Sequence, residues 1–266
     1  MGVSLAARRW PGTGGSVRAM SDSEYRLTGG CGCGAVRFEL TAPPVAAGYC
    51  HCTRCQRRTG GAWSLQARAA PGSFAITQGA DAIGSWQPEG GFAKEFCARC
   101  GSSLWSRSPD DPDVVSVRFG VMDDDPGIRP TYRMYLDSAA PFEPVPDDGL
   151  ARYGGVRPAV PPLSGTAWRG AWSDDATAAT LVFDGWRLSG SSGVNQYGGT
   201  YEAPPGAVVF GPVVATRMAG SEARMRVEQE LFALLAGSRP YTLVGDMLTI
   251  GEGAAARRFT AAGPDA

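Results

Sequence analysis

The chain has 266 residues, a formal net charge of −1 and 19% charged residues. This length is enough for one or two domains, each with its own core. Acidic and basic residues are interspersed, which excludes the concentrated positive charge of a nucleic-acid-binding protein. No apolar run is long enough to cross a bilayer, so we expect neither a nucleic acid nor a membrane as a partner.

Residues 1–22 are rich in Gly, Ser, Arg and Ala and lack the apolar stretch of a signal peptide. We expect this segment to be disordered, with Met20 as a candidate natural start. The cysteines that follow would serve as reduced metal ligands, and such thiols suit a reducing cytoplasm. We therefore expect a cytoplasmic protein.

Alternating residues within 23–45 predict strands around the first cysteine pair, and Pro43-Pro44 ends them. Three tryptophans, Trp63, Trp86 and Trp105, favour positions in the core over a ligand-binding platform. Further strands are predicted at residues 62–67, 74–77, 94–97, 103–106 and 114–119.

All seven cysteines lie in the first 100 residues, in an outer pair, a central group of three and a second outer pair. A C-x-C pair in a strand places two sulfurs on one face, and a C-x-x-C turn does the same. The outer pairs predict a closed four-thiolate zinc site, and the central group predicts a second zinc site with an open position. The pairs are Cys31 with Cys33 and Cys97 with Cys100, and the central group is Cys50, Cys52 and Cys55.

Two alternatives to zinc remain open. A complete disulfide framework would leave one of seven thiols unpaired, and a disulfide across C-x-C would be strained. Buried structural cysteines without a metal are the other alternative. His51, the one histidine of the chain, should point away from Cys50 and Cys52. A packed spacer is favoured over a ligand at this position, and His51 is also a candidate proton carrier.

Three blocks resemble the family of the glutathione-dependent formaldehyde-activating enzyme and centromere protein V. They are Gly29-Gly30-Cys31-Gly32-Cys33-Gly34, Cys50-His51-Cys52-x-x-Cys55-Gln56-Arg57-Arg58 and Phe96-Cys97-x-x-Cys100-Gly101-Ser102. Residues 117–124 and 140–153 resemble the family's C-terminal part, so the resemblance covers residues 23–153. Two features depart from the pattern: Tyr132–Tyr135 stands where many relatives carry a histidine, and Phe142 replaces a common tryptophan.

The resemblance implies a mostly β, Mss4-like zinc fold and, for the enzyme branch, carbon–sulfur lyase chemistry on a glutathione–formaldehyde adduct. It also implies that Cys31, Cys33, Cys97 and Cys100 hold a structural zinc, and that Cys50, Cys52 and Cys55 hold the zinc where chemistry occurs. Arg54, Arg57 and Arg58 form a basic cluster beside these ligands. They fit either a solvated strand-to-loop face or a clamp on glutathione carboxylates.

Residues 154–162 form a Pro-rich linker, and residues 163–262 form a second domain. One helix is predicted at residues 222–236, capped by Ser221 and ended by Gly237. Strands are predicted at residues 179–183, 186–190, 241–244, 247–250 and 258–260.

Three segments of this domain, 165–168, 189–201 and 216–219, together with Glu228-Gln229, resemble the META domain of HslJ-type proteins. The most specific is the Asn-x-Tyr-x-Gly-x-Tyr block at 195–201. Many relatives carry cysteines where this chain has Val194 and Gly220, and the absence of both fits a cytoplasmic protein. Asn195 and Arg217 are candidate site residues, although a turn-stabilising asparagine and a surface arginine are favoured.

The predicted fold class is mainly β with some α (α+β), a zinc-binding β fold followed by a small META-type β-sheet domain with one helix. We expect a carbon–sulfur lyase that uses two zinc ions and acts on a small thiol–aldehyde adduct, with glutathione as a co-substrate. Three protein ligands and an open position are typical of catalytic zinc. The alternative is a non-enzymatic zinc-stabilised binding module or adaptor, with a protein partner for the META domain. A zinc–thiolate redox or metal-buffering role is the least favoured.

Overall fold

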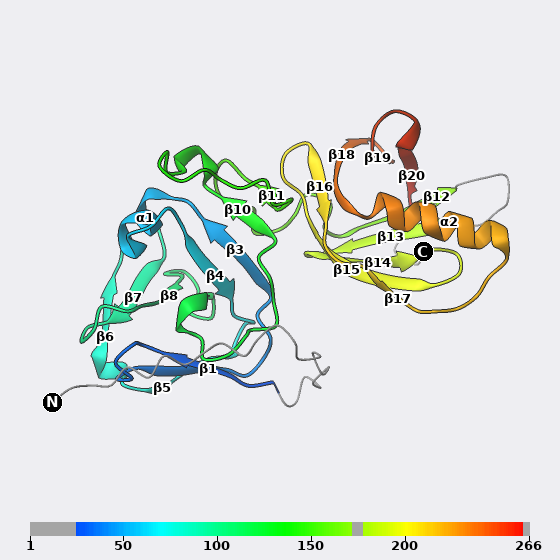
Figure 1. Cartoon of the computed structure of the whole chain (residues 1–266). Helices are drawn as coiled ribbons and strands as arrows, with labels where there is room; N and C mark the ends of the chain where they lie inside the picture. The colour runs from blue at the N-terminus through cyan, green and yellow to red at the C-terminus, as the bar shows by residue number, and fades with distance from the viewer. Residues whose placement is uncertain (1–24, 172–177, 263–266) are drawn as a thin grey trace. The chain divides into compact units, whose positions relative to one another are not determined.

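The computed structural model describes residues 25–171 and 178–262 (Figure 1). Within these ranges the chain is mainly β with two α-helices, which confirms the predicted class. Neither helix is long and apolar enough to cross a membrane. The chain divides into two compact units, one up to Pro130 and one from Thr131. The predicted domain limits of 23–153 and 163–262 stay a prediction, and the segment predicted to be disordered, 1–22, lies outside the described residues.

The first unit contains two groups of antiparallel strands. The smaller group follows the order β1 (Leu27–Gly30), β2 (Arg37–Leu40) and β5 (Phe74–Gln78). The larger group follows the order β3 (Ala46–Cys50), β4 (Ser64–Arg68), β9 (Val115–Arg118), β8 (Ser103–Arg107), β7 (Ala93–Cys97) and β6 (Ile83–Trp86). Strands β3 and β6 were not predicted from the sequence.

Aromatic side chains fill the core of the first unit. Trp105 is fully buried, and its ring centroid lies 4.9 Å from that of Phe74 and 5.7 Å from that of Phe38. Trp63 is half-buried. Trp86 is 49% exposed, so its predicted place in the core is wrong. It is the last residue of β6, an edge strand, where no neighbouring strand adds cover on one side.

A short helix, α1 (Thr53–Thr59), connects β3 to β4 and was not predicted. Cys52 occupies its N-cap position, and Gly60 ends it in a left-handed conformation at φ 68°. The Gly60 amide donates to the Gln56 carbonyl, as in a glycine C-cap. Arg57 and Arg58 lie in the last turn, where positive charge is favourable for the helix dipole. The strand-to-loop location predicted for the arginines is therefore wrong, although Arg54 and Arg57 are exposed, as a solvated face requires.

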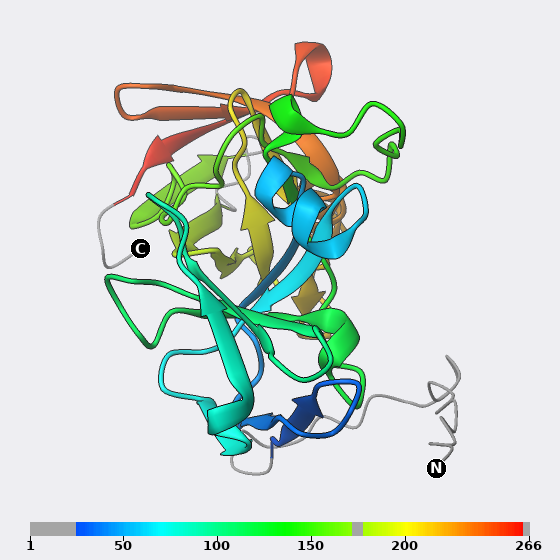
Figure 2. The same cartoon turned by 90° about the vertical axis from the view of Figure 1, so that its left-hand side faces the viewer.

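The second unit contains a closed antiparallel sheet (Figures 1 and 2). The order runs from β14 to β15, with β17 beyond it, and β14 and β15 also pair with each other, so eight strands form a ring. The ring order is β14 (Arg187–Ser191), β13 (Ala178–Asp184), β12 (Thr166–Ala171), β20 (Arg257–Ala261), β19 (Met247–Ile250), β18 (Gly237–Val244), β16 (Ala207–Phe210) and β15 (Gln196–Glu202). β17 (Val214–Ala215) pairs outside the ring with β15, and β10 (Tyr132–Met134) pairs in parallel with β11 (Ala151–Arg152).

The predicted helix of the second unit is confirmed as α2 (Glu222–Leu234), although it ends two residues earlier than expected. The Ser221 hydroxyl accepts a hydrogen bond from the Arg224 amide at 3.5 Å, as a helix cap does. Gly237 does not end the helix directly but begins β18, with φ +69°. The buried face of α2 includes Val227, Leu231 and Leu234, and the two leucines pack into the core of the ring.

Candidate metal centres

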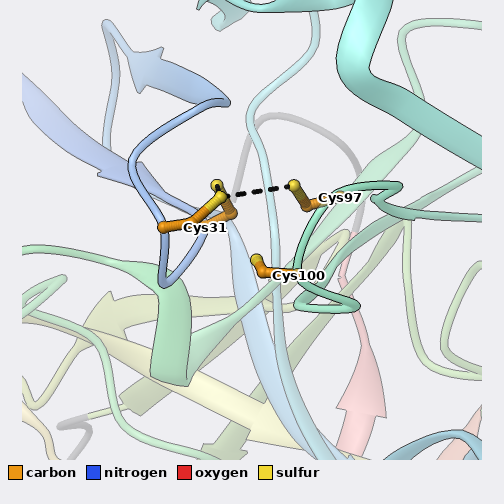
Figure 3. A group of neighbouring side chains, drawn as sticks. Cys31, Cys97 and Cys100 are labelled. Atoms are coloured by element: carbon orange, nitrogen blue, oxygen red, sulfur yellow. Dashed lines mark hydrogen bonds between the residues drawn. The ribbon is translucent and has the colours of Figure 1, made fainter. Parts of the chain in front are cut away.

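The four outer cysteines meet in one cluster formed by two turns (Figure 3). Cys31 and Cys33 lie in the turn after β1, and Cys97 and Cys100 lie at the end of β7 and in the turn that follows. The Sγ atoms of Cys31 and Cys33 are 3.5 Å apart, and those of Cys33 and Cys97 are 3.8 Å apart. Tetrahedral zinc with Zn–S bonds of about 2.3 Å requires sulfurs about 3.8 Å apart. This donor set therefore fits a closed metal site.

Local hydrogen bonds hold the sulfurs of this four-cysteine cluster. The Val36 amide donates to the Cys31 sulfur at 3.2 Å, and the Ser102 hydroxyl lies 3.2 Å from the Cys100 sulfur. The hydrogen bond with Ser102 lowers the pKa of Cys100 to about 6. A thiolate at neutral pH is the form that binds a metal ion.

The three central cysteines form a second cluster where β3 runs into α1. Cys50 ends β3, Cys52 caps α1, and Cys55 lies in the first turn of the helix. Their sulfurs lie within 4.8 Å of one another, and no fourth His, Cys, Asp or Glu ligand joins them in the described ranges. Cys50 and Cys55 are buried, while Cys52 is partly exposed. Three sulfur ligands fit a metal ion with one open position.

The three thiols of this cluster share protons unequally. The hydrogen bond with Cys52 raises the pKa of Cys50, and the hydrogen bond with Cys50 lowers the pKa of Cys55. Cys55 is therefore the sulfur that carries negative charge most readily.

The side chain of His51 packs beside this cluster without joining its ligand set. His51 is 1% exposed, and its ring centroid lies 5.7 Å from that of Trp63. The Trp63 ring also makes an edge contact with Tyr49 at 6.2 Å. This packing agrees with the interpretation of His51 as a spacer. No contact tests its candidate role as a proton carrier.

The three arginines of α1 contact different parts of the first unit. Arg54 donates to the Glu89 carbonyl at 3.0 Å. Arg58 turns inward and donates to the Glu95 carbonyl at 3.1 Å and to the Ser103 hydroxyl at 2.6 Å. Arg57 is exposed.

Sequence reasoning missed a buried arginine beside the three-cysteine cluster. Arg118 is 6% exposed and donates from Nη1 to the Ser64 hydroxyl at 3.2 Å. The segment Val115-Ser116-Val117-Arg118 was predicted as a strand, and its alternation already separates two apolar residues from two polar ones. That alternation places Arg118 and Ser116 on one face of the strand, and it was the sequence signal that could have pointed to Arg118. In the structure all four residues are buried, so both faces of the strand are covered.

In the second unit, Asn195 is structural, as favoured from the sequence. It is 2% exposed, and its amide nitrogen donates to Glu228 Oε2 at 2.9 Å and to the Met218 carbonyl at 3.1 Å. Its amide oxygen accepts from the Thr216 hydroxyl at 2.8 Å. Arg217 is exposed, in agreement with a surface arginine.

Two family models match the chain. The model of the glutathione-dependent formaldehyde-activating enzyme matches residues 26–138, and the META domain model matches residues 163–263. A Halomonas elongata protein, named as a candidate glutathione-dependent formaldehyde-activating enzyme, is 32% identical over 116 residues. The match covers 41% of this chain and 73% of that protein.

Two solved structures are similar to part of the chain. A crystal structure of a Rhodobacter sphaeroides protein has 22% identity and a TM-score of 0.32, and the match covers 47% of this chain and 98% of the other. An NMR structure of a Burkholderia xenovorans protein has 19% identity and a TM-score of 0.33, with coverage of 46% and 99%.

Proposed function

Because the chain belongs to the family of the glutathione-dependent formaldehyde-activating enzyme, we propose that it is a zinc-dependent carbon–sulfur lyase acting on a thiol–aldehyde adduct. Glutathione is the proposed thiol. The observation that carries this proposal is the three-cysteine cluster, in which three sulfurs converge and one of them, Cys52, is partly exposed. The proposal includes zinc at both clusters, an Mss4-like fold for the first unit and a cytoplasmic location.

The reaction joins the thiol sulfur to the aldehyde carbon and moves the thiol proton to the aldehyde oxygen, and its reverse breaks the same bond. A zinc ion held by Cys50, Cys52 and Cys55 would supply Lewis acidity and lower the pKa of a thiol. Cys50 and Cys55 close the inner side of the centre, because both are buried. A substrate would approach from the side of Cys52.

The helix that carries two of these cysteines also carries the proposed clamp. Arg54 and Arg58 each donate to a main-chain carbonyl. Arg57 is exposed, and no hydrogen bond or ion pair to another described residue occupies it. Its guanidinium fork suits a glutathione carboxylate. We therefore propose Arg57 as the principal contact, with Arg54 in support, while the inward side chain of Arg58 contributes only its charge.

The four-cysteine cluster has a structural role in this proposal. It joins a turn near residue 32 to a turn near residue 99, and two of its sulfurs, Cys31 and Cys97, are buried. A metal ion that binds the folded chain adds its binding free energy to the stability of the fold. All seven cysteines are free thiols, as metal ligands must be.

A non-enzymatic binding module is the second candidate. An apolar cavity in the second unit favours it, because such a cavity suits an apolar side chain of a partner. The cavity is lined by Phe210, Val213, Phe232 and Leu235, among others. Three thiolates also leave a divalent ion with net negative charge, which weakens it as a Lewis acid.

The test is the rate of adduct formation from glutathione and formaldehyde, measured by NMR exchange above the uncatalysed rate. We expect Cys52→Ser to lose the catalysed rate, while Thr53→Ala, an exposed neighbour on α1, retains it. A folded Cys52→Ser protein with full activity would refute the proposal. Binding of a protein partner by a chain without turnover would support the second candidate.

A further inference from the structure

A stripe of buried and partly buried polar side chains runs across four neighbouring strands of the first unit. The strand register places Lys94 of β7 opposite Ser106 of β8, and Arg118 of β9 opposite Gln66 of β4. Lys94 Nζ and Arg118 Nη2 both donate to the Ser106 hydroxyl, at 3.3 and 2.9 Å. Arg118 Nη1 continues the stripe to Gln66 and to the Ser64 hydroxyl.

The two cations of this stripe, and Arg58, which reaches β7 and β8 from α1, have no carboxylate partner among the described residues. Within the described ranges, no ion pair involves Arg58, Lys94 or Arg118. Two of their nitrogens, Arg58 Nη1 and Arg118 Nε, are buried without a hydrogen-bond acceptor. Neutral hydroxyl and amide oxygens satisfy hydrogen bonds but do not offset charge. A buried cation is costly unless a negative charge lies close to it.

The three-cysteine cluster is the negative charge that these cations face. Ser64, whose hydroxyl accepts from Arg118 Nη1, is the register partner of Cys50 across β3 and β4, so the two side chains lie beside each other on one face of the sheet. Ser64 therefore connects Arg118 to the three-cysteine cluster through Cys50. The charges of Arg58 and Lys94 also act on Cys55. Lys94 and Arg118 meet at Ser106, and Arg58 follows Cys55 by three positions on α1, where such residues are neighbours, so three positive groups from three elements lie around the cluster.

We propose that Arg118 is a positioning residue of the three-cysteine metal centre and that it forms, with Arg58 and Lys94, a cationic platform beneath it. The inference rests on the proposed binding of a metal ion by Cys50, Cys52 and Cys55. Three thiolates and one divalent ion carry a net charge of −1, which the platform offsets. The remaining positive charge favours an anionic ligand, such as a thiolate, over a neutral one at the open position.

The four-cysteine cluster is an internal reference, because no unpaired buried cation contacts its sulfurs among the described residues. Its sulfurs contact the Val36 amide and the Ser102 hydroxyl. The arginines nearest to it in sequence face carboxylates: Arg37 pairs with Asp123, and Arg99 lies 4.0 Å from Asp81. Loss of the platform should therefore weaken one metal site of the chain and leave the other unchanged.

The experiment loads the full chain with Co²⁺ and follows its release to a chelator. We expect Arg118→Gln to release one equivalent at least about tenfold faster than wild type, the usual effect of losing a partner of a metal ligand. The second equivalent should leave at the wild-type rate. Arg118→Lys should restore slow release in part, because it keeps the charge. Arg107→Gln is the matched control, since this β8 arginine already faces the carboxylate of Glu95.

Two further readouts separate positioning from folding. The Co²⁺–thiolate absorption band should shift in Arg118→Gln, and titration with glutathione should show weaker binding at the same centre. If Arg118→Gln does not fold, Ser64→Ala and Lys94→Gln take its place, because both remove less from the core.

If folded Arg118→Gln and Ser64→Ala proteins both release Co²⁺ at the wild-type rate, the proposed cationic platform is wrong. Failure of the proposed function has a different signature. A chain in which Cys52→Ser leaves the Co²⁺ content unchanged has no metal at the three-cysteine cluster, whatever Arg118 does.

Discussion

Arg157 and Glu202 form a two-pronged buried ion pair in the second unit. Arg157 Nε lies 2.7 Å from Glu202 Oε2, and Arg157 Nη2 lies 2.9 Å from Glu202 Oε1. The guanidinium also lies over the Trp186 ring, 3.2 Å from its centroid. The Glu202 carboxylate accepts further bonds from the Thr131 and Tyr153 hydroxyls, at 2.8 and 2.9 Å. The Glu202 carboxylate on β15 therefore accepts hydrogen bonds from three residues that precede the region matched by the META domain model, Thr131, Tyr153 and Arg157.

Glu202→Ala should destabilise the second unit strongly. Removing one partner of a buried pair leaves the other charge uncompensated, which costs roughly 3–5 kcal/mol. Urea unfolding of the full chain, followed by circular dichroism, measures this loss. Glu222→Ala is the control, because Glu222 and Arg226 form an exposed pair at 3.5 Å and should contribute little. Equal effects of the two substitutions would contradict the role given to Glu202.

The pair of Arg133 and Asp148 predicts a pH dependence of stability. Burial by itself would raise the pKa of Asp148, but the hydrogen bond and the charge of Arg133 outweigh it and lower that pKa. A carboxyl whose pKa is lower in the folded state contributes stability above its unfolded pKa, and the contribution disappears as pH falls through the folded pKa.

Asp148→Asn should therefore be less stable than wild type at pH 7, and the gap should close below about pH 4, near the unfolded pKa of aspartate. Urea unfolding of both chains at several pH values measures the gap. Asp147→Asn serves as a neighbouring control, because Asp147 is exposed. A gap that stays constant down to pH 2 would exclude this ion pair as its cause.

Val194 and Gly220 are close neighbours in the second unit. A Cβ atom placed on Gly220 would lie 2.8 Å from Val194 Cγ2, so the native pair leaves no room for a larger residue at 220. Val194→Cys with Gly220→Cys removes that clash and should form a disulfide under oxidising conditions. Closing this loop should stabilise the second unit by about 3 kcal/mol. A thiol count and melting with and without reductant test this, and a double variant that keeps two extra free thiols contradicts it.

Arg57 provides the test of the glutathione clamp. Arg57→Ala should raise KM for glutathione roughly three- to tenfold with kcat unchanged, because it removes a contact present equally in the ground state and transition state. Arg129→Ala is the control, an exposed arginine that pairs with Asp125. An unchanged KM in Arg57→Ala would remove this residue from the proposed clamp.

The grouping within each cysteine block could be predicted, because the short spacing places those sulfurs side by side. The joining of the two outer pairs into one site was predicted from the use of all seven cysteines and from the family resemblance. The helix α1 could not, because seven residues are too few to show a helical repeat and six of them are polar or charged, with Cys55 as the one buried residue. Asn195 was correctly predicted as a structural residue. Its main partner, Glu228, is 33 positions away, and only the fold reveals the pairing.

The burial of Arg118 is the largest feature that the sequence concealed. A single arginine at the end of a strand predicts a solvent-facing position. The strand order β4-β9-β8-β7 brings Ser64, Ser106 and Lys94 to the same face as Arg118, although they come from distant parts of the chain. No local pattern encodes this order, because it depends on which strands pair.

The metal content of the purified full chain, beside that of Cys52→Ser, tests the central claim most directly. The account predicts two zinc ions per wild-type chain and one per Cys52→Ser chain, with the four-cysteine cluster still loaded. The same metal content in both proteins would contradict a separate metal centre at Cys50, Cys52 and Cys55.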